Sequence, residues 1–259
     1  IVSKTGESLP MNSPTNSLDL VAARSSGATK IYGSGETEVR ALDNIDVTFS
    51  KGRFTAIMGP SGSGKSTLMH CMAGLDDLTS GKVFIGDTDL TELSERELTL
   101  LRRSQIGFIF QAYNLVPTLN AIENITLPLD LAGVKADAAW VDEIVEVVSL
   151  EDRLTHRPNE LSGGQQQRVA VSRALASKPE IIFADEPTGN LDSKTGTEIL
   201  EFMQLATKEL EQTIVMVTHD PVAASFSDQV IFLADGQVVG DLEDPTADGV
   251  LDQMRSIGN

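Results

Sequence analysis

The chain has one cysteine, few basic residues and no long apolar run. A single cysteine, Cys71, among 259 residues excludes an internal disulfide framework, and we expect it to be a small buried residue. No apolar run approaches the roughly 18 residues that a membrane-spanning helix needs. The 20 Lys and Arg against 38 Asp and Glu give a net charge of −18, without the basic stripe that displaces counterions from nucleic acid. We therefore predict a cytoplasmic protein with no nucleic-acid partner.

The composition that is present is that of an ordinary globular protein, with 41% hydrophobic and 22% charged residues. Residues 1–20 are rich in Ser, Thr, Asn and Pro without a hydrophobic period, which predicts a disordered tail. Residues 241–259 read as an acidic C-terminal tail with one short possible helix. We therefore expect the fold to lie between these two segments.

A glycine-rich stretch follows the apolar run Phe54–Met58 and precedes an apolar helix start at Leu68. Strand, glycine-rich turn and helix are the context of a phosphate-binding loop, because the backbone N–H groups and the positive helix end face an anion. Lys65 adds a charge for the outer phosphates, and the Ser66 hydroxyl is a hard oxygen ligand for Mg²⁺. An ordinary Gly/Ser turn is the alternative. The predicted nucleotide-binding residues are Gly59, Pro60, Ser61, Gly62, Ser63, Gly64, Lys65, Ser66 and Thr67.

A second helix start with free N–H groups is predicted near residue 163. Ser162 is an N-cap candidate, and Gly163, Gly164 and Gln165 follow it into the helical run Gln166–Ala176. Because the glycines leave the helix start bare, an anion can approach it. The alternative is a flexible turn with no ligand.

Paired carboxylates follow the buried strand that begins at Ile181. Asp185 and Glu186 stand at its carboxyl end, where α/β sheets bind their ligands. We expect Asp185 to hold Mg²⁺ through water and Glu186 to orient or deprotonate an attacking water. Capping of the next turn is the structural alternative.

Three further polar or aromatic residues stand at predicted strand ends. Gln111 follows the buried strand Ile106–Phe110, and His219 follows a buried strand that starts at Thr213. Tyr32 ends the first strand, where its ring can stack on adenine. The alternatives are an ordinary loop histidine and a half-buried strand tyrosine.

The motifs together resemble those of one family. Gly59–Thr67 resembles a Walker A motif, and Leu161–Gln165 matches the signature of ATP-binding cassette (ABC) ATPases letter for letter. Ile181–Glu186 resembles Walker B with its catalytic glutamate. The positions that look like the A-loop, Q-loop, D-loop and H-loop of that family are Tyr32, Gln111, Asp192 and His219.

The sub-family is indicated by Phe110–Pro117, Glu123–Ile125, Leu127–Leu129 and Asp185–Ser193. These segments look like the lipoprotein-release and macrolide-efflux ATPases, a group that includes peptide exporters and the cell-division ATPase. The pair Ala112-Tyr113 departs mildly from the usual residues of that group.

The resemblance implies an α/β fold with a P-loop, RecA-like core at 21–92 and 166–240. It also implies an antiparallel β subdomain and an inserted helical subdomain at 93–165. Its members bind two ATP with Mg²⁺ between two identical chains, so that the signature of one chain covers ATP on Walker A of the other. The roles it implies are a general base at Glu186, a γ-phosphate contact at His219, catalysis with Lys65 and Gln111, nucleotide contacts at Ser162–Gln165 and Asp192, and Mg²⁺ ligands at Ser66, Gln111 and Asp185.

The resemblance also implies a peripheral location on the cytoplasmic face of the membrane and an integral membrane permease with a large extracytoplasmic domain. We expect its helix near Leu115, Val116, Leu119 and Ile122, unless these residues are subdomain core. The predicted function is the ATPase subunit that drives export or extraction of a lipoprotein, peptide or drug. The alternative is a cell-division ATPase that gates a cell-wall hydrolase without transport. Non-transport ABC ATPases of DNA repair are disfavoured by the short interval between Walker A and the signature.

Overall fold

The computed structural model describes residues 20–257, so most of the predicted tail at 1–20 lies outside the described residues. A six-stranded sheet forms the centre, in the order β10-β9-β3-β8-β7-β6. The neighbours from β9 to β6 pair in parallel, and β10 pairs antiparallel with β9. The strands are β3 (Phe54–Met58), β6 (Ile106–Phe110), β7 (Ile181–Asp185), β8 (Ile214–Val217), β9 (Gln229–Ala234) and β10 (Gln237–Glu243).

The four inner strands of this sheet are apolar because both of its faces are covered. Alternate residues belong to two different cores, as the period of two in a strand requires. Phe54, Ala56 and Met58 pack into one core, whereas Ile57 packs into the other. The sheet therefore separates two apolar layers, and the parallel strands deliver their carboxyl ends to one edge.

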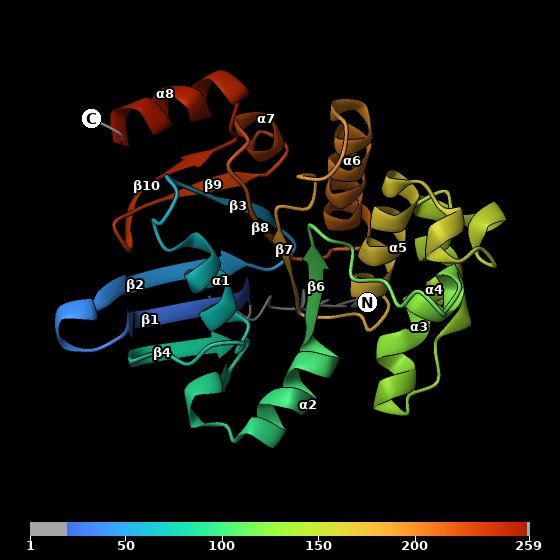
Figure 1. Ribbon diagram of the computed structural model, residues 1–259, viewed down its shortest axis with the longest axis horizontal. Coiled ribbons are helices and arrows are strands. Elements are labelled where there is room, and N and C mark those ends of the chain that lie inside the picture. The colour runs from blue at the N-terminus through green and yellow to red at the C-terminus, as the bar shows by residue number, and fades with distance from the viewer. Residues whose placement is uncertain (1–19, 258–259) are drawn as a thin grey trace, which may run out of the picture.

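A second, antiparallel sheet covers one side, in the order β2-β1-β4-β5 (Figure 1). Its strands are β1 (Val21–Tyr32), β2 (Val39–Ser50), β4 (Ser80–Ile85) and β5 (Thr88–Asp89). Leu42, Ile45 and Phe49 of β2 are buried in the core that also holds Met69. The first strand, predicted to end at Tyr32, is confirmed, and this sheet is the antiparallel subdomain that the family fold implies.

The helices are α1 (Lys65–Met72), α2 (Glu95–Gln105), α3 (Ala121–Ala132), α4 (Ala138–Val147), α5 (Gly163–Leu175), α6 (Ser193–Glu209), α7 (Pro221–Ala224) and α8 (Ala247–Ile257). Cys71 lies buried on α1, as predicted. Figure 1 shows α3, α4 and α5 grouped on the side away from the antiparallel sheet. Among residues 20–257, no helix is both long and apolar enough to cross a membrane.

The predicted helical subdomain at 93–165 begins too early. β6 is a strand of the central sheet, and Leu98 and Leu101 of α2 pack into the core that contains the antiparallel sheet. The sequence pattern of α2 is helical, but its apolar face fits this core rather than α3 and α4. The helical insertion therefore follows β6.

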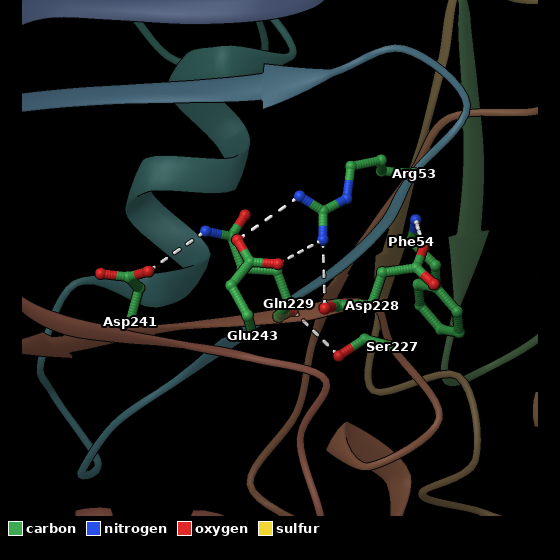
Figure 2. Close-up of polar contacts among 7 residues, drawn as sticks. All are labelled: Arg53, Phe54, Ser227, Asp228, Gln229, Asp241 and Glu243. Carbon is green, nitrogen blue, oxygen red and sulfur yellow. Dashed lines mark hydrogen bonds and ion pairs between the residues drawn. The ribbon is translucent and has the colours of Figure 1, made fainter.

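The predicted C-terminal tail at 241–259 is likewise not separate over its described part. β10 continues to Glu243, and Val250 of α8 is fully buried against the larger core. Figure 2 shows how this end is joined to β3: the Arg53 guanidinium donates to the Glu243 carboxylate at 2.5 Å and to the Asp228 carbonyl at 3.2 Å. The Asp228 carboxylate in turn accepts a hydrogen bond from the N–H of Phe54 at 2.8 Å.

Candidate functional site

The loop between β3 and α1 depends on two glycines. Gly59 has φ 153°, and a β-carbon there would lie 2.0 Å from the Leu233 carbonyl oxygen. Gly64 has φ 100°, and a β-carbon there would lie 2.4 Å from the Ala41 carbonyl oxygen. Because a side chain at either position would collide with backbone, these glycines let the loop run close to its neighbours and begin α1 at Lys65.

The Lys65 side chain folds back over this loop. Its ammonium donates to the carbonyls of Gly59 and Pro60, at 2.8 Å each. Burial lowers the pKa of Lys65, and the carboxylates of Glu186 and Asp185 oppose that shift. A half-buried ammonium that bonds two backbone carbonyls is well placed to exchange one of them for a phosphate oxygen. The buried Ser63 hydroxyl has no hydrogen-bond partner within the described residues, which also suits an anion-binding loop.

The two carboxylates predicted at the end of β7 lie beside the end of β8. The N–H of Glu186 donates to the Val217 carbonyl at 3.0 Å, which sets the carboxylate at this edge of the sheet. Glu186 Oε1 lies 2.7 Å from His219 Nδ1, and the Thr218 hydroxyl donates to Glu186 Oε2 at 3.4 Å. Burial and the neighbouring Glu186 carboxylate raise the pKa of Asp185, whereas His70 and Lys65 lower it.

These groups share one pocket of about 410 Å³. A cation, two carboxylates, a histidine and the loop therefore face the same space, as phosphate chemistry with a metal requires. The lining residues are Ala41, Gly59, Ser61, Gly62, Gly64, Lys65, Ser66, Thr67, Asp185, Glu186, Val217 and His219. The sequence prediction missed Ala41, which carries no polar signal, and Thr218, which stands between a buried strand and the predicted His219.

Gln111 does not line this pocket. Its side-chain amide donates to Asn190 Oδ1 at 3.2 Å, and Asn190 Nδ2 donates back to the Gln111 carbonyl at 2.8 Å. Gln111 is therefore tied to the turn that follows Glu186. A part in Mg²⁺ binding would require this reciprocal pair to open.

The signature residues are also outside the pocket. Ser162 caps α5, accepting from the N–H of Gln165 at 3.3 Å, and Gln165 Oε1 accepts from the N–H of Ser162 at 2.9 Å. A β-carbon on Gly163 would lie 3.0 Å from the Tyr113 hydroxyl. The predicted N-cap at Ser162 is confirmed, and within one chain this helix start does not meet the Lys65 loop.

Asp192 caps α6 in this structure. Its carboxylate accepts from the N–H groups of Lys194 and Thr195, at 3.1 Å each, and from the Thr195 hydroxyl at 2.6 Å. The Thr195 hydroxyl, followed by the N–H groups, lowers the pKa of Asp192. A nucleotide contact at Asp192 would be additional to this role.

Tyr32 ends β1 and is 41% exposed. Its hydroxyl donates to Asp76 Oδ2 at 2.5 Å, and the Lys30 ammonium lies 4.8 Å from the ring centre. Lys30 also donates to Asp76 Oδ1 at 2.6 Å, so both side chains are fixed by one carboxylate. The ring is thus held at the surface rather than packed in a core, although it does not line the phosphate pocket.

Comparison with known proteins agrees with this arrangement. The sequence model of the family described as ABC transporter matches residues 42–189. The lipoprotein-releasing system ATP-binding protein LolD of Geobacter metallireducens is 47% identical over 215 residues, which cover 82% of this chain and 96% of the relative. The bacitracin export ATP-binding protein BceA of Halalkalibacterium halodurans is 46% identical over 213 residues, covering 81% and 83%.

A solved structure is similar as well. It is the dimer of the ATP-binding cassette MJ0796 of Methanocaldococcus jannaschii in a post-hydrolysis state with ADP and phosphate. The identity is 42% and the TM-score 0.76, with 86% of this chain and 99% of that one covered. From these matches and from its fold, the chain belongs to the ATP-binding proteins of the ABC transporter family.

Proposed function

We propose that this chain binds and hydrolyses ATP in the pocket between the Lys65 loop and the ends of β7 and β8. The observation that carries the proposal is the placement of Lys65, Asp185, Glu186 and His219 around one space. The loop N–H groups and Lys65 bind and neutralise the phosphates, which is most of what phosphoryl transfer asks of a protein. Glu186 takes the proton from the attacking water, and His219 holds that carboxylate and contacts the γ-phosphate.

Mg²⁺ fits the same pocket through Ser66 and Asp185, which are both oxygen donors on its wall. The raised pKa of Asp185 reflects a partly buried carboxylate that lies near another carboxylate, a situation that a cation would relieve. When bound, the metal would neutralise charge on the transferred phosphate. We propose that Gln111 senses bound nucleotide through its hydrogen bonds to Asn190, in the turn that follows Glu186. Metal binding by Gln111 also remains part of the proposal.

The working unit in this proposal is a homodimer. The N-terminus of α5, at Ser162–Gln165, does not reach the pocket of its own chain. The N–H groups of Ser162 and Gln165 bond each other's side chains, so those of Gly163 and Gly164 are the ones offered to a ligand. A second copy can bring its Gly163 and Gly164 N–H groups to the γ-phosphate, with Asp192 and Gln165 alongside. Tyr32 then stacks on the adenine at the other end of the nucleotide. The MJ0796 cassette is dimeric in its ADP-bound structure, which supports this arrangement.

We further propose that an integral membrane permease with a large extracytoplasmic domain binds the chain at the cytoplasmic face of the membrane. A second pocket, of about 470 Å³, is lined by the apolar Phe108, Phe110 and Pro128 and by the basic Arg102, Arg103 and Arg173, among others. Burial lowers the pKa of Arg173, whose guanidinium already donates to the carbonyls of Tyr113 and Asn114. A cytoplasmic helix of the permease with apolar and acidic side chains suits this basic, aromatic groove in an otherwise acidic chain.

This groove is not lined by Leu115, Val116, Leu119 or Ile122. Leu115 and Ile122 pack against the larger core, which favours the subdomain-core alternative for these two. LolD and BceA are named for lipoprotein release and bacitracin export. Export or extraction of a lipoprotein, peptide or drug is therefore our proposal for this chain. The alternative, a cell-division ATPase that gates a cell-wall hydrolase, is distinguished by whether the reconstituted complex moves a substrate.

The first test is the Glu186→Gln variant. It keeps the shape of the side chain but cannot accept the proton, so we expect turnover to be abolished while ATP binding remains. The unhydrolysed nucleotide should hold the chains together, and light scattering should show a dimer that wild type forms only transiently. Glu180→Gln is the matched control, because Glu180 precedes β7, at the end of that strand opposite to Glu186, where it pairs with Lys51. Turnover of Glu186→Gln at the wild-type rate would remove the carboxylate from its role.

A further inference from the structure

Gln167 is a fully buried polar residue on the helix that begins with the signature. Its exposed fraction is 0%, and its amide Nε2 donates to the Pro187 carbonyl at 2.6 Å. Its other amide atom, Oε1, is buried without a hydrogen-bond partner in the described part of the chain. A buried glutamine that forms one short bond and leaves an acceptor unpaired is costly, so packing alone does not account for it.

The carbonyl that Gln167 holds belongs to the turn that carries the catalytic carboxylate. Pro187 directly follows Glu186, whose φ of 47° is left-handed. The turn is closed by the N–H of Gly189, which donates to the Glu186 carbonyl at 3.0 Å. The left-handed conformation of Glu186 is disfavoured by its own β-carbon and by the proline that follows it. Contacts from outside the turn are therefore needed to keep the turn in place.

The other end of this connection is the signature. Gln167 lies about one helical turn from Gly163 on α5, so a shift of the helix start is transmitted to it with little bending. The neighbouring Arg168 also ties α5 to its surroundings, by donating to Glu198 of α6 at 2.6 Å and to the Val148 carbonyl at 3.1 Å. The helix is thus held on one side to α6 and on another to the Glu186 turn.

We propose that Gln167 is a positioning residue that couples the signature helix to Glu186 of the same chain. The inference depends on the proposed function, in which the signature contacts ATP held by the second chain while Glu186 serves ATP held by its own. In that arrangement, nucleotide at one site pulls α5, and Gln167 carries the displacement to the carboxylate at the other site. The two sites of the dimer therefore hydrolyse cooperatively, and the unpaired Oε1 marks the Gln167 amide as free to change partners.

The test is Gln167→Met, which keeps the length of the side chain but removes both the donor and the unpaired acceptor. The variant removes one unpaired acceptor but leaves the buried Pro187 carbonyl without its donor, so the melting temperature should be unchanged or lower by a few degrees. The kcat should fall roughly tenfold, which corresponds to about 1.4 kcal/mol, because the bond that positions the turn after Glu186 is lost. The KM for ATP should stay constant because Gln167 does not line the pocket, and the Hill coefficient for ATP should fall from above 1 in wild type to 1.

Gln212→Met is the matched control. Gln212 is also buried, and its Nε2 donates at 2.7 Å to the carbonyl of Pro179. Pro179 precedes β7, so this bond lies at the opposite end of that strand from Glu186. The control variant should keep the wild-type kcat and Hill coefficient. Gln167→Asn, which retains the amide but is shorter by one methylene, is the second variant if Gln167→Met does not fold.

An unchanged kcat and Hill coefficient in the Gln167 variants, or an equal loss in Gln212→Met, would overturn the proposal. The outcome is separable from that for Glu186. If Glu186→Gln remains active, the proposed function fails, whereas an inactive Glu186→Gln beside a fully active Gln167→Met removes only the coupling role.

Discussion

Glu186, the proposed catalytic carboxylate, has a strained left-handed backbone conformation. Its left-handed conformation costs roughly 1–3 kcal/mol relative to an ordinary one, and the next residue is a proline. The surrounding bonds, from the Val217 carbonyl on one side and Gly189 on the other, hold it there. The conformation lets the chain turn sharply after β7, so that Asp185 and Glu186 both stay at the edge of the sheet.

Cys71 shows the opposite situation, a reactive group that the fold makes inert. Burial raises the pKa of its thiol to about 12, since the thiolate loses hydration and the Asp76 carboxylate repels it. The neutral thiol is thus favoured in the folded chain. Its contribution to stability is complete below the unfolded pKa and is lost as pH rises toward the folded one.

We therefore expect Cys71 not to react with a thiol-exchange reagent at pH 8 while the chain is folded. In denaturant it should react at the rate of an ordinary thiol, because the reactive species is the thiolate. Labelling of the native chain should be slowed by Mg²⁺ and ATP, which stabilise the folded state by mass action. Absorbance of the released thiolate gives the rates. Rapid labelling of the native chain would show that the thiol is not shielded as described.

At the scale of elements, the strands and the loop can be predicted from sequence because their signals are local. A window of about ten residues is enough to recognise the apolar run at 54–58, the glycines that follow it and the carboxylates after β7. Sequence does not predict the hydrogen bond from Gln167 to Pro187 or the two reciprocal hydrogen bonds between Gln111 and Asn190, because each joins distant segments of the chain. The assignment of α2 fails for the same reason: its pattern predicts a helix but not which core receives it.

The starts of α5 and α6 touch through Gly164, and this contact makes a prediction. A β-carbon on Gly164 would lie 2.3 Å from Thr195 Cγ2. Gly164→Ala should therefore lose about 1–3 kcal/mol to overpacking, offset by up to ~1 kcal/mol of better helix propensity. Thr195→Ser removes the offending methyl and keeps the hydroxyl that donates to Asp192.

The double variant Gly164→Ala/Thr195→Ser should recover the stability of wild type or exceed it, and chemical denaturation measures each step. Thr195→Ser alone is the control and should change stability little. Additive losses in the double variant would mean that Gly164 is needed for another reason than the space filled by Thr195.

At the scale of the whole molecule, the central sheet and the apolar cores on its two faces stabilise the folded state, whereas the net surface charge destabilises it. The smaller core holds residues from β1 to β9, and the larger core holds residues from β3 to α8, whose Val250 is buried in it. Outside them, a net charge of −18 is spread over a chain of 259 residues. Such a charge opposes the compact state by self-repulsion, whereas a surface ion pair such as Arg53–Glu243 adds only about 0–1 kcal/mol.

Because repulsion extends over the whole surface and the pairs are local, salt should stabilise this chain. Raising ionic strength from about 10 mM to 150 mM shortens the screening length from about 30 Å to about 8 Å. A resulting gain of about 1 kcal/mol would raise the melting temperature by ~2–4 °C in a domain of this size. If screening is the cause, choline chloride should raise the melting temperature as much as sodium chloride does. If chloride bound in the phosphate loop does not contribute, the melting temperature of Lys65→Ala should rise with salt as much as that of wild type. A melting temperature that falls with salt would mean that the ion pairs outweigh the repulsion.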